Sequence, residues 1–289
     1  MTVGELQREG ASRLPRGEGL PDPGHEARWL LARAMERSES WVLAHGDEPV
    51  EEATTARFRA WVERRAGGEP AHYIAGACSF CGREFLVSPA ALIPRPETEL
   101  VISCVQRLTL PPRPHVLDVG TGSGCLAVTL ALDLPDASVA ATDLSLAALE
   151  LGRRNGERLS ARVHFAMGDL ASHLRAPFDL IVANLPYVPS GEVAGLPREI
   201  RDHEPPLALA GGADGADLLR DLLADLPRLL APRGFALLEM GPGQRHALAP
   251  LLAALGLSEV ERGLDHAGVE RVLVLQRVQR PVASVGSPG

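Results

Sequence analysis

An amide, a main-chain carbonyl and an aromatic ring stand in immediate succession in Asn184-Leu185-Pro186-Tyr187, directly after a largely apolar run. The Asn184 side chain offers an amide oxygen, which accepts a hydrogen bond from an N–H group. Pro186 favours an extended conformation of the residue before it, so we expect Leu185 to act through its carbonyl while its side chain is incidental. With the flat face and hydroxyl of Tyr187, these groups predict a cradle for a planar NH₂ group; a plain proline-containing turn is the alternative.

A glycine-rich turn in "VLDVGTGSGCLAVTLA", residues 116–131, is the second candidate site, and it reads as strand, turn and helix. Gly120, Gly122 and Gly124 let the backbone bend tightly and approach a ligand that a Cβ would exclude. Their spacing is G-x-G-x-G, whereas dinucleotide folds use G-x-G-x-x-G. Asp118 is expected at the mouth of the turn, where a carboxylate repels a pyrophosphate and attracts an ammonium group. The turn therefore favours an amino-acid-bearing cofactor over NAD, with a simple tight connection as the alternative.

Two further acids end the next two predicted strands, Asp143 in "VAATDLS" and Asp169 in "AMGDL". A carboxylate at the first position can accept both hydroxyls of a ribose, and the second can take the amino group of an adenine. Ligands of open α/β sheets lie beyond the carboxyl ends of the strands, where both acids fall. Each acid alone is also a common turn or helix-cap residue. Together with the glycine turn they predict S-adenosylmethionine as the cofactor.

The elements that must position these residues alternate between strand and helix from residue 115 onward. Strands are predicted at 115–120, 138–143, 161–169, 178–185, 234–241 and 270–278, with helices near 123–133, 146–159, 215–231 and 243–256. Apolar strands that alternate with helices indicate a parallel sheet covered on both faces. We therefore expect an α/β domain at 99–280, followed by a disordered tail at 281–289.

The chain before this domain has a different pattern. Residues 1–75 predict short helices that need one another to bury their apolar stripes, which is typical of a small bundle. Residues 76–98 predict a hairpin turned at Gly82 and a linker, in which Pro96 suits the first turn of a helix. The sequence thus predicts a helical domain, a hairpin linker and a larger domain.

The amino-acid composition argues against several classes of function. The 289 residues are 45% hydrophobic, enough for one large and one smaller domain. The net charge of −8 argues against a general nucleic-acid binder, which usually carries a basic face. Cys78 and Cys81 form a C-x-x-C without a second pair at zinc spacing, so no metal is predicted, and Cys104 and Cys125 are expected in the core. The N-terminus lacks a signal-peptide pattern and no apolar run could span a membrane, so a reducing cytoplasm fits best.

Six segments together resemble the glutamine N5-methyltransferases of peptide chain release factors. They are "GEPAHYIAG", "FLVSPAALIPRPETE", "VLDVGTGSGCLAV", "ANLPYVP", "HEPPLALAGGADG" and "LLEMGPGQ", within a resemblance that runs from about residue 66 to 278. It implies a Rossmann-like class I S-adenosylmethionine-dependent methyltransferase domain, with an N-terminal helical substrate-recognition domain joined by a β-hairpin. The implied activity is methyl transfer to the glutamine N5 of the factors' Gly-Gly-Gln motif. From charge and hydropathy, neither nucleic acid nor membrane is expected as a direct partner.

The resemblance also implies roles for individual positions. The cofactor would be faced by Gly120, Thr121, Gly122, Ser123, Gly124, Asp143, Leu170 and Asn184, and the glutamine by residues 184–187. Arg95, between two prolines, is a candidate for substrate contact, with a surface ion pair as the alternative. Glu204 is a candidate brace for the active-site loop, and His203 receives no role.

Three function classes remain open. The first is a glutamine methyltransferase that acts on release factors or on a ribosomal protein. The family's usual motif has proline where this chain has Leu185, and the N-L-P-Y form resembles that of ribosomal RNA adenine dimethyltransferases. The second class is therefore an adenine-N6 nucleic-acid methyltransferase, against which the acidic chain and the segments "IPRPETE" and "HEPPLALAGG" argue. A nicotinamide oxidoreductase or a non-enzymatic nucleotide binder is the third class.

Overall fold

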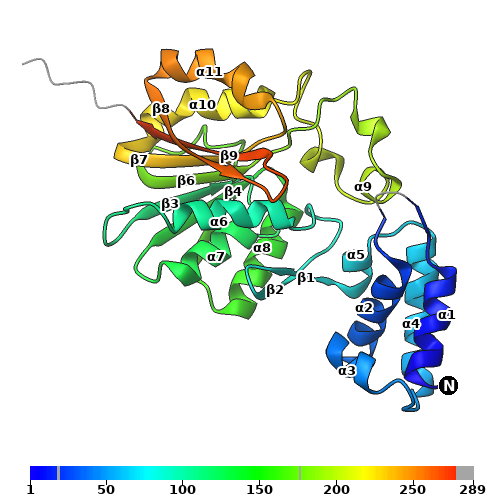
Figure 1. The fold of residues 1–289 in the computed structure, drawn as a ribbon. Helices are drawn as coiled ribbons and strands as arrows, with labels where there is room; N and C mark the ends of the chain where they lie inside the picture. The colour runs from blue at the N-terminus through cyan, green and yellow to red at the C-terminus, as the bar shows by residue number, and fades with distance from the viewer. Residues whose placement is uncertain (18–19, 176, 278–289) are drawn as a thin grey trace, which may run out of the picture.

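A helical bundle and a larger α/β unit make up the protein, joined by a short hairpin (Figure 1). The computed structural model describes residues 1–17, 20–175 and 177–277, so the predicted tail at 281–289 lies outside the described residues. None of the helices in these ranges is both long enough and apolar enough to cross a membrane.

The N-terminal bundle confirms the helices predicted before residue 76. It consists of α1 (Val3–Arg13), α2 (Pro23–Met35), α3 (Glu39–Ala44), α4 (Glu52–Ala66) and α5 (Ala71–Ala75). Side chains of Thr2, Asp22 and Ser38 cap the first three helices by accepting hydrogen bonds from main-chain N–H groups that have no partner within the helix. Leu30 and Phe58 are fully buried, which fixes the apolar faces of α2 and α4 against each other.

A hairpin of β1 (Ala77–Phe80) and β2 (Arg83–Leu86) follows the bundle, as predicted. Its two turn residues, Cys81 and Gly82, both have positive φ, at 47° and 70°, which suits the tight turns that match the twist of paired strands. After a linker, Pro96 opens a short 3-10 helix η1 (Pro96–Thr98), and α6 (Glu99–Val105) continues from it. The linker therefore carries the chain from the bundle to the start of the α/β unit.

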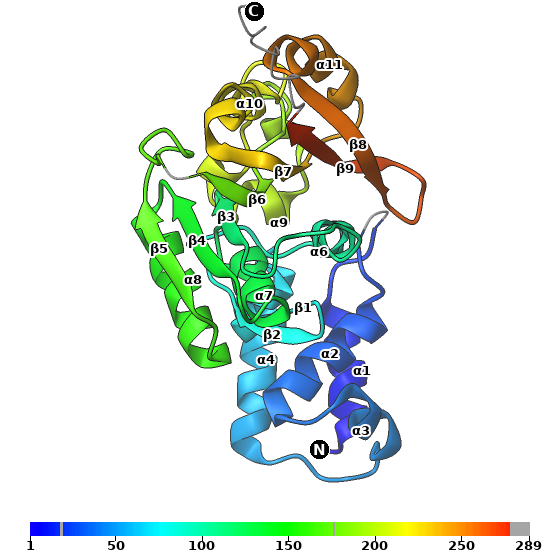
Figure 2. The ribbon, with the colours of Figure 1, turned by 90° about the vertical axis from the view of Figure 1, so that its left-hand side faces the viewer.

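The sheet of the described residues has seven strands in the order β5-β4-β3-β6-β7-β9-β8, which Figure 2 shows from one edge to the other. The strands are β3 (His115–Val119), β4 (Ser138–Asp143), β5 (Val163–Met167), β6 (Phe178–Asn184), β7 (Leu230–Glu239), β8 (Leu257–Leu264) and β9 (Glu270–Arg277). Strands β3 to β7 run parallel, whereas β9 pairs antiparallel with both β7 and β8.

Two features of the sheet differ from the prediction. The sheet is mixed rather than parallel, and strand β8 was not predicted. Strand β8 lies at an edge, and only Leu257 and Gly263 are buried along it. Its charged and half-exposed residues hide the strand pattern, because an edge strand needs no continuous apolar run.

Helices cover both faces of the sheet (Figure 1). One face is covered by α10 (Asp217–Leu229) and α11 (Gln244–Leu255), and the other by α6, α7 (Cys125–Asp133) and α8 (Leu146–Leu159). Alternating side chains of one strand serve the two faces: Leu117 packs with α10 and α11, while Val116 packs with α6 and α7. The long connection between β6 and α10 holds η2 (Val193–Gly195), α9 (Arg198–Arg201) and η3 (Pro206–Ala208).

Candidate active site

A cavity of about 520 Å³ lies at the carboxyl ends of the parallel strands. Its volume is within the range of about 300–1,000 Å³ found for small-molecule sites. The structure brings most of the predicted site residues to its lining: Arg95, Gly120, Gly122, Asp143, Asp169, Leu170, Asn184, Leu185, Pro186 and Tyr187. Strands β4 and β6 flank β3 on opposite sides, so the cavity occupies the point where the chain changes direction across the sheet.

Asp118 does not lie at the mouth of the glycine turn, and that expectation is wrong. The residue is 1% exposed, beneath the turn. Its Oδ2 accepts hydrogen bonds from the Thr121 hydroxyl at 2.6 Å and from the Ala127 N–H at 3.1 Å. Burial raises the pKa of Asp118 to about 7. The carboxyl group thus ties the turn to the first turn of α7 instead of lining the cavity.

Three further turn residues, Thr121, Ser123 and Gly124, are not among those that line the cavity. The Ser123 carbonyl accepts a hydrogen bond from Asn155 Nδ2 at 2.9 Å. Gly124 has φ of 80°, and a Cβ there would lie 3.0 Å from the Cα of Gly152. Its glycine identity therefore follows from the close approach of α7 and α8. These residues shape the turn, while Gly120 and Gly122 border the cavity.

Asp143 sits at the end of β4 with its carboxylate held in place. Its Oδ2 accepts a hydrogen bond from the Gly122 N–H at 2.9 Å, and its Oδ1 accepts one from the Ser145 N–H at 2.8 Å. A carboxylate oxygen can accept more than one hydrogen bond, so both retain capacity for a ligand. The glycine turn and the acid are thus one rigid unit.

Asp169 and Leu170 follow β5 on the other side of the cavity. Asp169 is exposed, and Leu170 adopts the left-handed region with φ of 48°. The Leu170 carbonyl accepts a hydrogen bond from the Thr142 hydroxyl at 3.0 Å. Strand β4 therefore anchors this segment as well as the glycine turn, whose Gly120 N–H donates to the Thr142 carbonyl at 2.9 Å.

Asn184 ends β6, and its amide group is oriented by a neighbouring hydroxyl. Its Nδ2 donates a hydrogen bond to Thr98 Oγ1 at 2.9 Å. The hydrogen bonds of the described residues include none to Asn184 Oδ1. The amide oxygen is thus an available acceptor in a residue that lines the cavity.

The Leu185 side chain is not incidental, contrary to the prediction from sequence. It is 2% exposed and belongs to the core cluster on the α10 face of the sheet. A Cβ at Gly120 would lie 2.8 Å from Leu185 Cδ2, so the leucine packs directly against the glycine turn. The Leu185 carbonyl, by contrast, receives no hydrogen bond from the described residues.

The segment at 211–217 braces the main chain of Pro186 and Tyr187. Gln244 Nε2 donates a hydrogen bond to the Tyr187 carbonyl at 3.1 Å. A Cβ at Gly211 would collide with the Pro186 carbonyl oxygen, and one at Gly215 would collide with that of Tyr187. The glycines of "LAGGADG" are therefore required by close backbone packing behind the motif.

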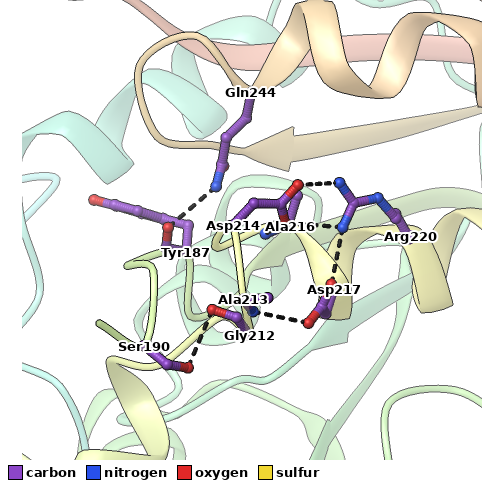
Figure 3. Close-up of polar contacts among 9 residues, drawn as sticks. All are labelled: Tyr187, Ser190, Gly212, Ala213, Asp214, Ala216, Asp217, Arg220 and Gln244. Carbon is purple, nitrogen blue, oxygen red and sulfur yellow. Dashed lines mark hydrogen bonds and ion pairs between the residues drawn. The ribbon is translucent and has the colours of Figure 1, made fainter. Parts of the chain in front are cut away.

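An arginine and two aspartates hold this bracing segment in shape (Figure 3). Arg220 donates to Asp214 Oδ1 at 2.9 Å and to Asp217 Oδ1 at 2.8 Å. Asp217 Oδ2 in turn accepts from the Ala213 N–H at 3.0 Å. Hydrogen bonds from Arg220 and from the Ala216 N–H lower the pKa of Asp214 to about 2. All three charged side chains lie outside the cavity, so they support the site without entering it.

Arg95 borders the cavity but its guanidinium is engaged in an ion pair with Glu204. Glu204 Oε2 also accepts a hydrogen bond from the Ile93 N–H at 3.2 Å. The Glu204 side chain is 1% exposed, and burial raises its pKa. Glu204 therefore fastens the linker to the connection between β6 and α10.

Thr98 and Glu239 are residues that sequence reasoning did not assign to the site. They are 2% and 1% exposed, and Glu239 lines the cavity. Glu239 follows the apolar run "FALL", just as Asp143 and Asn184 follow theirs. This position at the end of an apolar strand could have indicated from the sequence that Glu239 borders the site.

The described residues were searched for side chains that could form a metal centre, the cysteines included. Within the described ranges, no group of three or more His, Cys, Asp or Glu residues could hold a metal ion. Burial raises the pKa of the Cys78 thiol to about 11 and that of Cys81 to about 12. Cys104 and Cys125 are buried, as predicted.

Two family models match the chain. The model described as the PrmC N-terminal domain matches residues 5–76, and the methyltransferase small domain matches residues 96–196. A relative from Moorella thermoacetica named release factor glutamine methyltransferase is 40% identical over 282 residues, covering 96% of this chain and 99% of the relative. A relative of the same name from Bordetella pertussis is 42% identical over 259 residues, covering 88% of this chain and 96% of the relative.

Solved structures share the fold. A methyltransferase from Pyrococcus furiosus superposes with a TM-score of 0.54 at 19% identity, covering 70% of this chain and 92% of that one. The T. thermophilus 16S rRNA N2 G1207 methyltransferase, in complex with AdoMet and guanosine, has a TM-score of 0.50 at 21% identity, covering 70% of this chain and 49% of that one. The chain belongs to the release factor glutamine methyltransferase family, and its α/β unit is a class I S-adenosylmethionine-dependent methyltransferase.

Proposed function

We propose that the enzyme methylates the side-chain amide nitrogen, N5, of the glutamine in the Gly-Gly-Gln motif of peptide chain release factors. The observation that carries the proposal is a pair of acceptors in adjacent residues at the cavity, Asn184 Oδ1 and the Leu185 carbonyl. Neither receives a hydrogen bond from the described residues. An amide NH₂ group presents two hydrogens, which two such acceptors can take.

The residues of the cavity fit S-adenosylmethionine. Gly122, with φ of 55°, brings its backbone to the lining without a Cβ in the way. Asp143 is held so that its carboxylate can accept from ribose hydroxyls, and Asp169 and Leu170 lie where the adenine is expected. When bound, the cofactor supplies an electrophilic methyl group on a sulfonium.

Proposed roles at the glycine turn differ from residue to residue. Gly120 and Gly122 contact the cofactor directly, since both border the cavity. Asp118, Thr121, Ser123 and Gly124 act by holding the turn in shape. All of these residues thus belong to the proposed site: two contact the cofactor, and the other four keep the turn in the shape that allows this contact.

The two acceptors compensate for the weak nucleophilicity of an amide nitrogen, whose lone pair is delocalised into the carbonyl. Asn184 Oδ1 and the Leu185 carbonyl aim the nitrogen by each accepting one hydrogen, and such alignment can supply several kcal/mol of the barrier. Positive charge that develops on the substrate nitrogen during methyl transfer would make its N–H hydrogens more acidic. Fixed acceptors then bind them more strongly than in the ground state. One proton leaves the nitrogen to water.

Pro186 and Tyr187 complete the substrate side of the cavity. Both line it, and their main chain is held from behind by Gln244 and the glycines of the bracing segment. The Tyr187 ring would pack against the aliphatic part of the glutamine side chain. Burial raises the pKa of Tyr187, so its hydroxyl stays neutral at physiological pH.

The N-terminal bundle, residues 1–75, is proposed to recognise the rest of the release factor. Arg65 of α4 forms ion pairs with Glu26 of α2 at 2.7 Å and with Glu199 of α9 at 2.7 Å. The bundle therefore reaches the connection that leads to the cavity. Because release factors work on the ribosome, this role implies a cytoplasmic enzyme.

Methylation of a purified release factor tests the proposal. The full chain is incubated with S-adenosylmethionine and the factor, and peptide mass spectrometry locates the methyl group. We expect one methyl group on the Gly-Gly-Gln glutamine, and none on a factor whose motif glutamine is replaced by alanine. Parallel reactions offer ribosomal proteins and RNA. Methyl transfer to one of these, with the release factor untouched, would overturn the proposal.

A further inference from the structure

The linker between β2 and η1, residues 87–95, forms one wall of the cavity. Four consecutive linker residues line the cavity, namely Pro89, Ala90, Ala91 and Leu92. Ala91 lies beside the glycine turn, since a Cβ added at Gly122 would be 3.7 Å from the Cβ of Ala91. Ala91 also packs with Ala148 and Leu151 of α8. This wall therefore borders the part of the cavity in which S-adenosylmethionine is proposed to bind.

The linker has no regular structure of its own. Between Leu86 and Pro96 the chain forms neither helix nor strand, so hydrogen bonds from neighbouring elements have to fix its shape. A loop that is already held in its binding conformation saves the free energy that would otherwise be spent on ordering it when the ligand binds. The contacts that fix this wall should therefore affect the affinity for the cofactor.

One side-chain amide fastens the start of the wall to the glycine turn. Asn155 of α8 is fully buried. Its Oδ1 accepts a hydrogen bond from the Leu86 N–H at 2.7 Å, and its Nδ2 donates to the Leu86 carbonyl at 3.0 Å and to the Ser123 carbonyl at 2.9 Å. The amide oxygen and both amide hydrogens thus have partners. One residue of α8 therefore holds the end of β2 and the glycine turn at a fixed separation.

The middle of the wall is held from the N-terminal bundle. The hydroxyl of Tyr73, in α5, donates a hydrogen bond to the Ala91 carbonyl at 2.8 Å. Tyr73 is 7% exposed and packs with Cys78, Val87 and Ile93. The surrounding side chains therefore fix the position of its hydroxyl. Through this contact the bundle holds the linker residue that lies beside Gly122.

We propose that Asn155 and Tyr73 are positioning residues for S-adenosylmethionine, which hold the linker as a preformed wall beside the glycine turn. Neither residue lines the cavity, so both act through the main chain of other residues. The inference rests on the proposed function, because that function places the cofactor in this cavity. It adds that the bundle contributes to cofactor binding, through Tyr73, as well as to recognition of the protein substrate.

Three variants of the full chain test the two positions. Asn155→Ala removes the amide group. Asn155→Asp keeps the volume and an acceptor, but an ionised carboxylate donates no hydrogen bond to the Leu86 and Ser123 carbonyls. Tyr73→Phe removes one hydroxyl and keeps the ring. The dissociation constant for S-adenosylmethionine is measured by titration calorimetry without any protein substrate, and the melting temperature is measured alongside.

Three further variants are controls. Leu229→Ala lowers stability far from the cavity, because Leu229 is fully buried and directly precedes β7, at the edge of the sheet opposite the carboxyl ends of the parallel strands. Thr129→Val removes a fully buried hydroxyl that has no hydrogen-bond partner among the described residues, as a match for Tyr73→Phe. Asp143→Ala reports whether the cofactor binds in the cavity at all.

We expect both Asn155 variants to raise the Kd for S-adenosylmethionine about tenfold or more, and Tyr73→Phe to raise it several-fold, the effect of losing buried hydrogen bonds. Leu229→Ala should melt at a lower temperature and keep the Kd within about twofold of the parent. Thr129→Val should also keep the parental Kd. Asp143→Ala should bind the cofactor more weakly than the parent.

Hydrogen–deuterium exchange of the cofactor-free protein provides a second measurement. Peptides that cover residues 86–95 should exchange faster in Asn155→Ala and in Tyr73→Phe than in the parent, because the linker opens more readily once a fastening contact is lost. The same peptides should exchange at the parental rate in Thr129→Val. This comparison detects a loosened wall independently of activity and of cofactor binding.

Parental Kd values in the variants of both positions would overturn the inference. A rise in Kd as large in Leu229→Ala would also overturn it, because lost stability alone would then explain the effect. Weaker binding in the Asn155 variants with parental binding in Tyr73→Phe would overturn the contribution of the bundle. Unchanged binding in Asp143→Ala would instead contradict the cofactor position on which the proposed function depends, so the two failures are distinguishable.

Discussion

The Leu185 side chain fills the space beside the glycine turn, while its carbonyl receives no hydrogen bond from the described residues. One residue thus serves packing through its side chain and chemistry through its main chain. The family's usual proline at this position keeps the carbonyl and replaces the packing group. No hydrogen bond from the Leu185 N–H is formed among the described residues, so a proline ring would remove none.

Leu185→Pro should therefore lose stability and keep activity. Replacing a 2% exposed leucine by a smaller ring should lower the free energy of unfolding by about 1–3 kcal/mol. The turnover rate on a release factor should stay within a few-fold of the parent. Urea unfolding and kcat measure the two effects, with Leu185→Ala as the comparison that removes packing without adding a ring. Unchanged stability, or lost activity with intact cofactor binding, would contradict this division of roles.

Arg65 connects three helices, α2, α4 and α9, through one guanidinium group. Its side chain is 3% exposed, and that of Glu26 is 7% exposed, whereas Glu199 is 29% exposed. Breaking a buried pair by removing one partner is costly because the other charge is left uncompensated. These ion pairs hold the bundle against the connection that lines the cavity. They stabilise the packing of helices and do not contact the site itself.

Arg65→Met should destabilise the protein by about 3–5 kcal/mol, since Glu26 would remain buried and unpaired. The double variant Arg65→Met with Glu26→Gln should recover much of that loss. It should still raise the KM for the release factor, because α9 would lack its tie to α4. Arg13→Met, which breaks surface pairs with Glu63 and Glu9, should cost at most about 1 kcal/mol and leave KM unchanged. If the double variant had the parental KM for the release factor, the contact between the bundle and α9 would have no role in substrate recognition.

The sequence predicts well those elements that are determined by residues close together in the chain. Apolar strands, the hairpin at Gly82 and the acids at strand ends all follow from adjacent residues. Strand β8 was missed because an edge strand shows no continuous apolar run. Thr98 was missed for another reason: it meets Asn184 across 86 positions of sequence, and no local pattern records that contact.

Two buried carboxyl groups should make the free energy of unfolding of the protein depend on pH. Burial raises the pKa of both Asp118 and Glu239 to about 7, from ordinary values of 3.8 and 4.5. The folded state therefore binds more protons than the unfolded state between these values. Their contribution to stability is complete below about pH 4 and is lost as the pH rises through about 7.

Asp118→Asn and Glu239→Gln should remove this pH dependence. Relative to the parent, the free energy of unfolding of each variant should rise between about pH 5 and 8, by up to about 3 kcal/mol. Chemical denaturation at several pH values gives the difference directly. A difference that stays constant over this range would mean that the two carboxyl groups titrate normally in the folded protein.

The turnover of Asn184→Ala on a release factor tests the proposed acceptor role of Asn184 most directly. The substitution removes the amide oxygen proposed to bind an N–H hydrogen, and losing one such fixed group typically costs about 10²–10³ in rate. We expect kcat to fall by that amount while the melting temperature stays close to that of the parent. A folded variant that methylates the glutamine at the parental rate would contradict a catalytic role of the Asn184 amide oxygen.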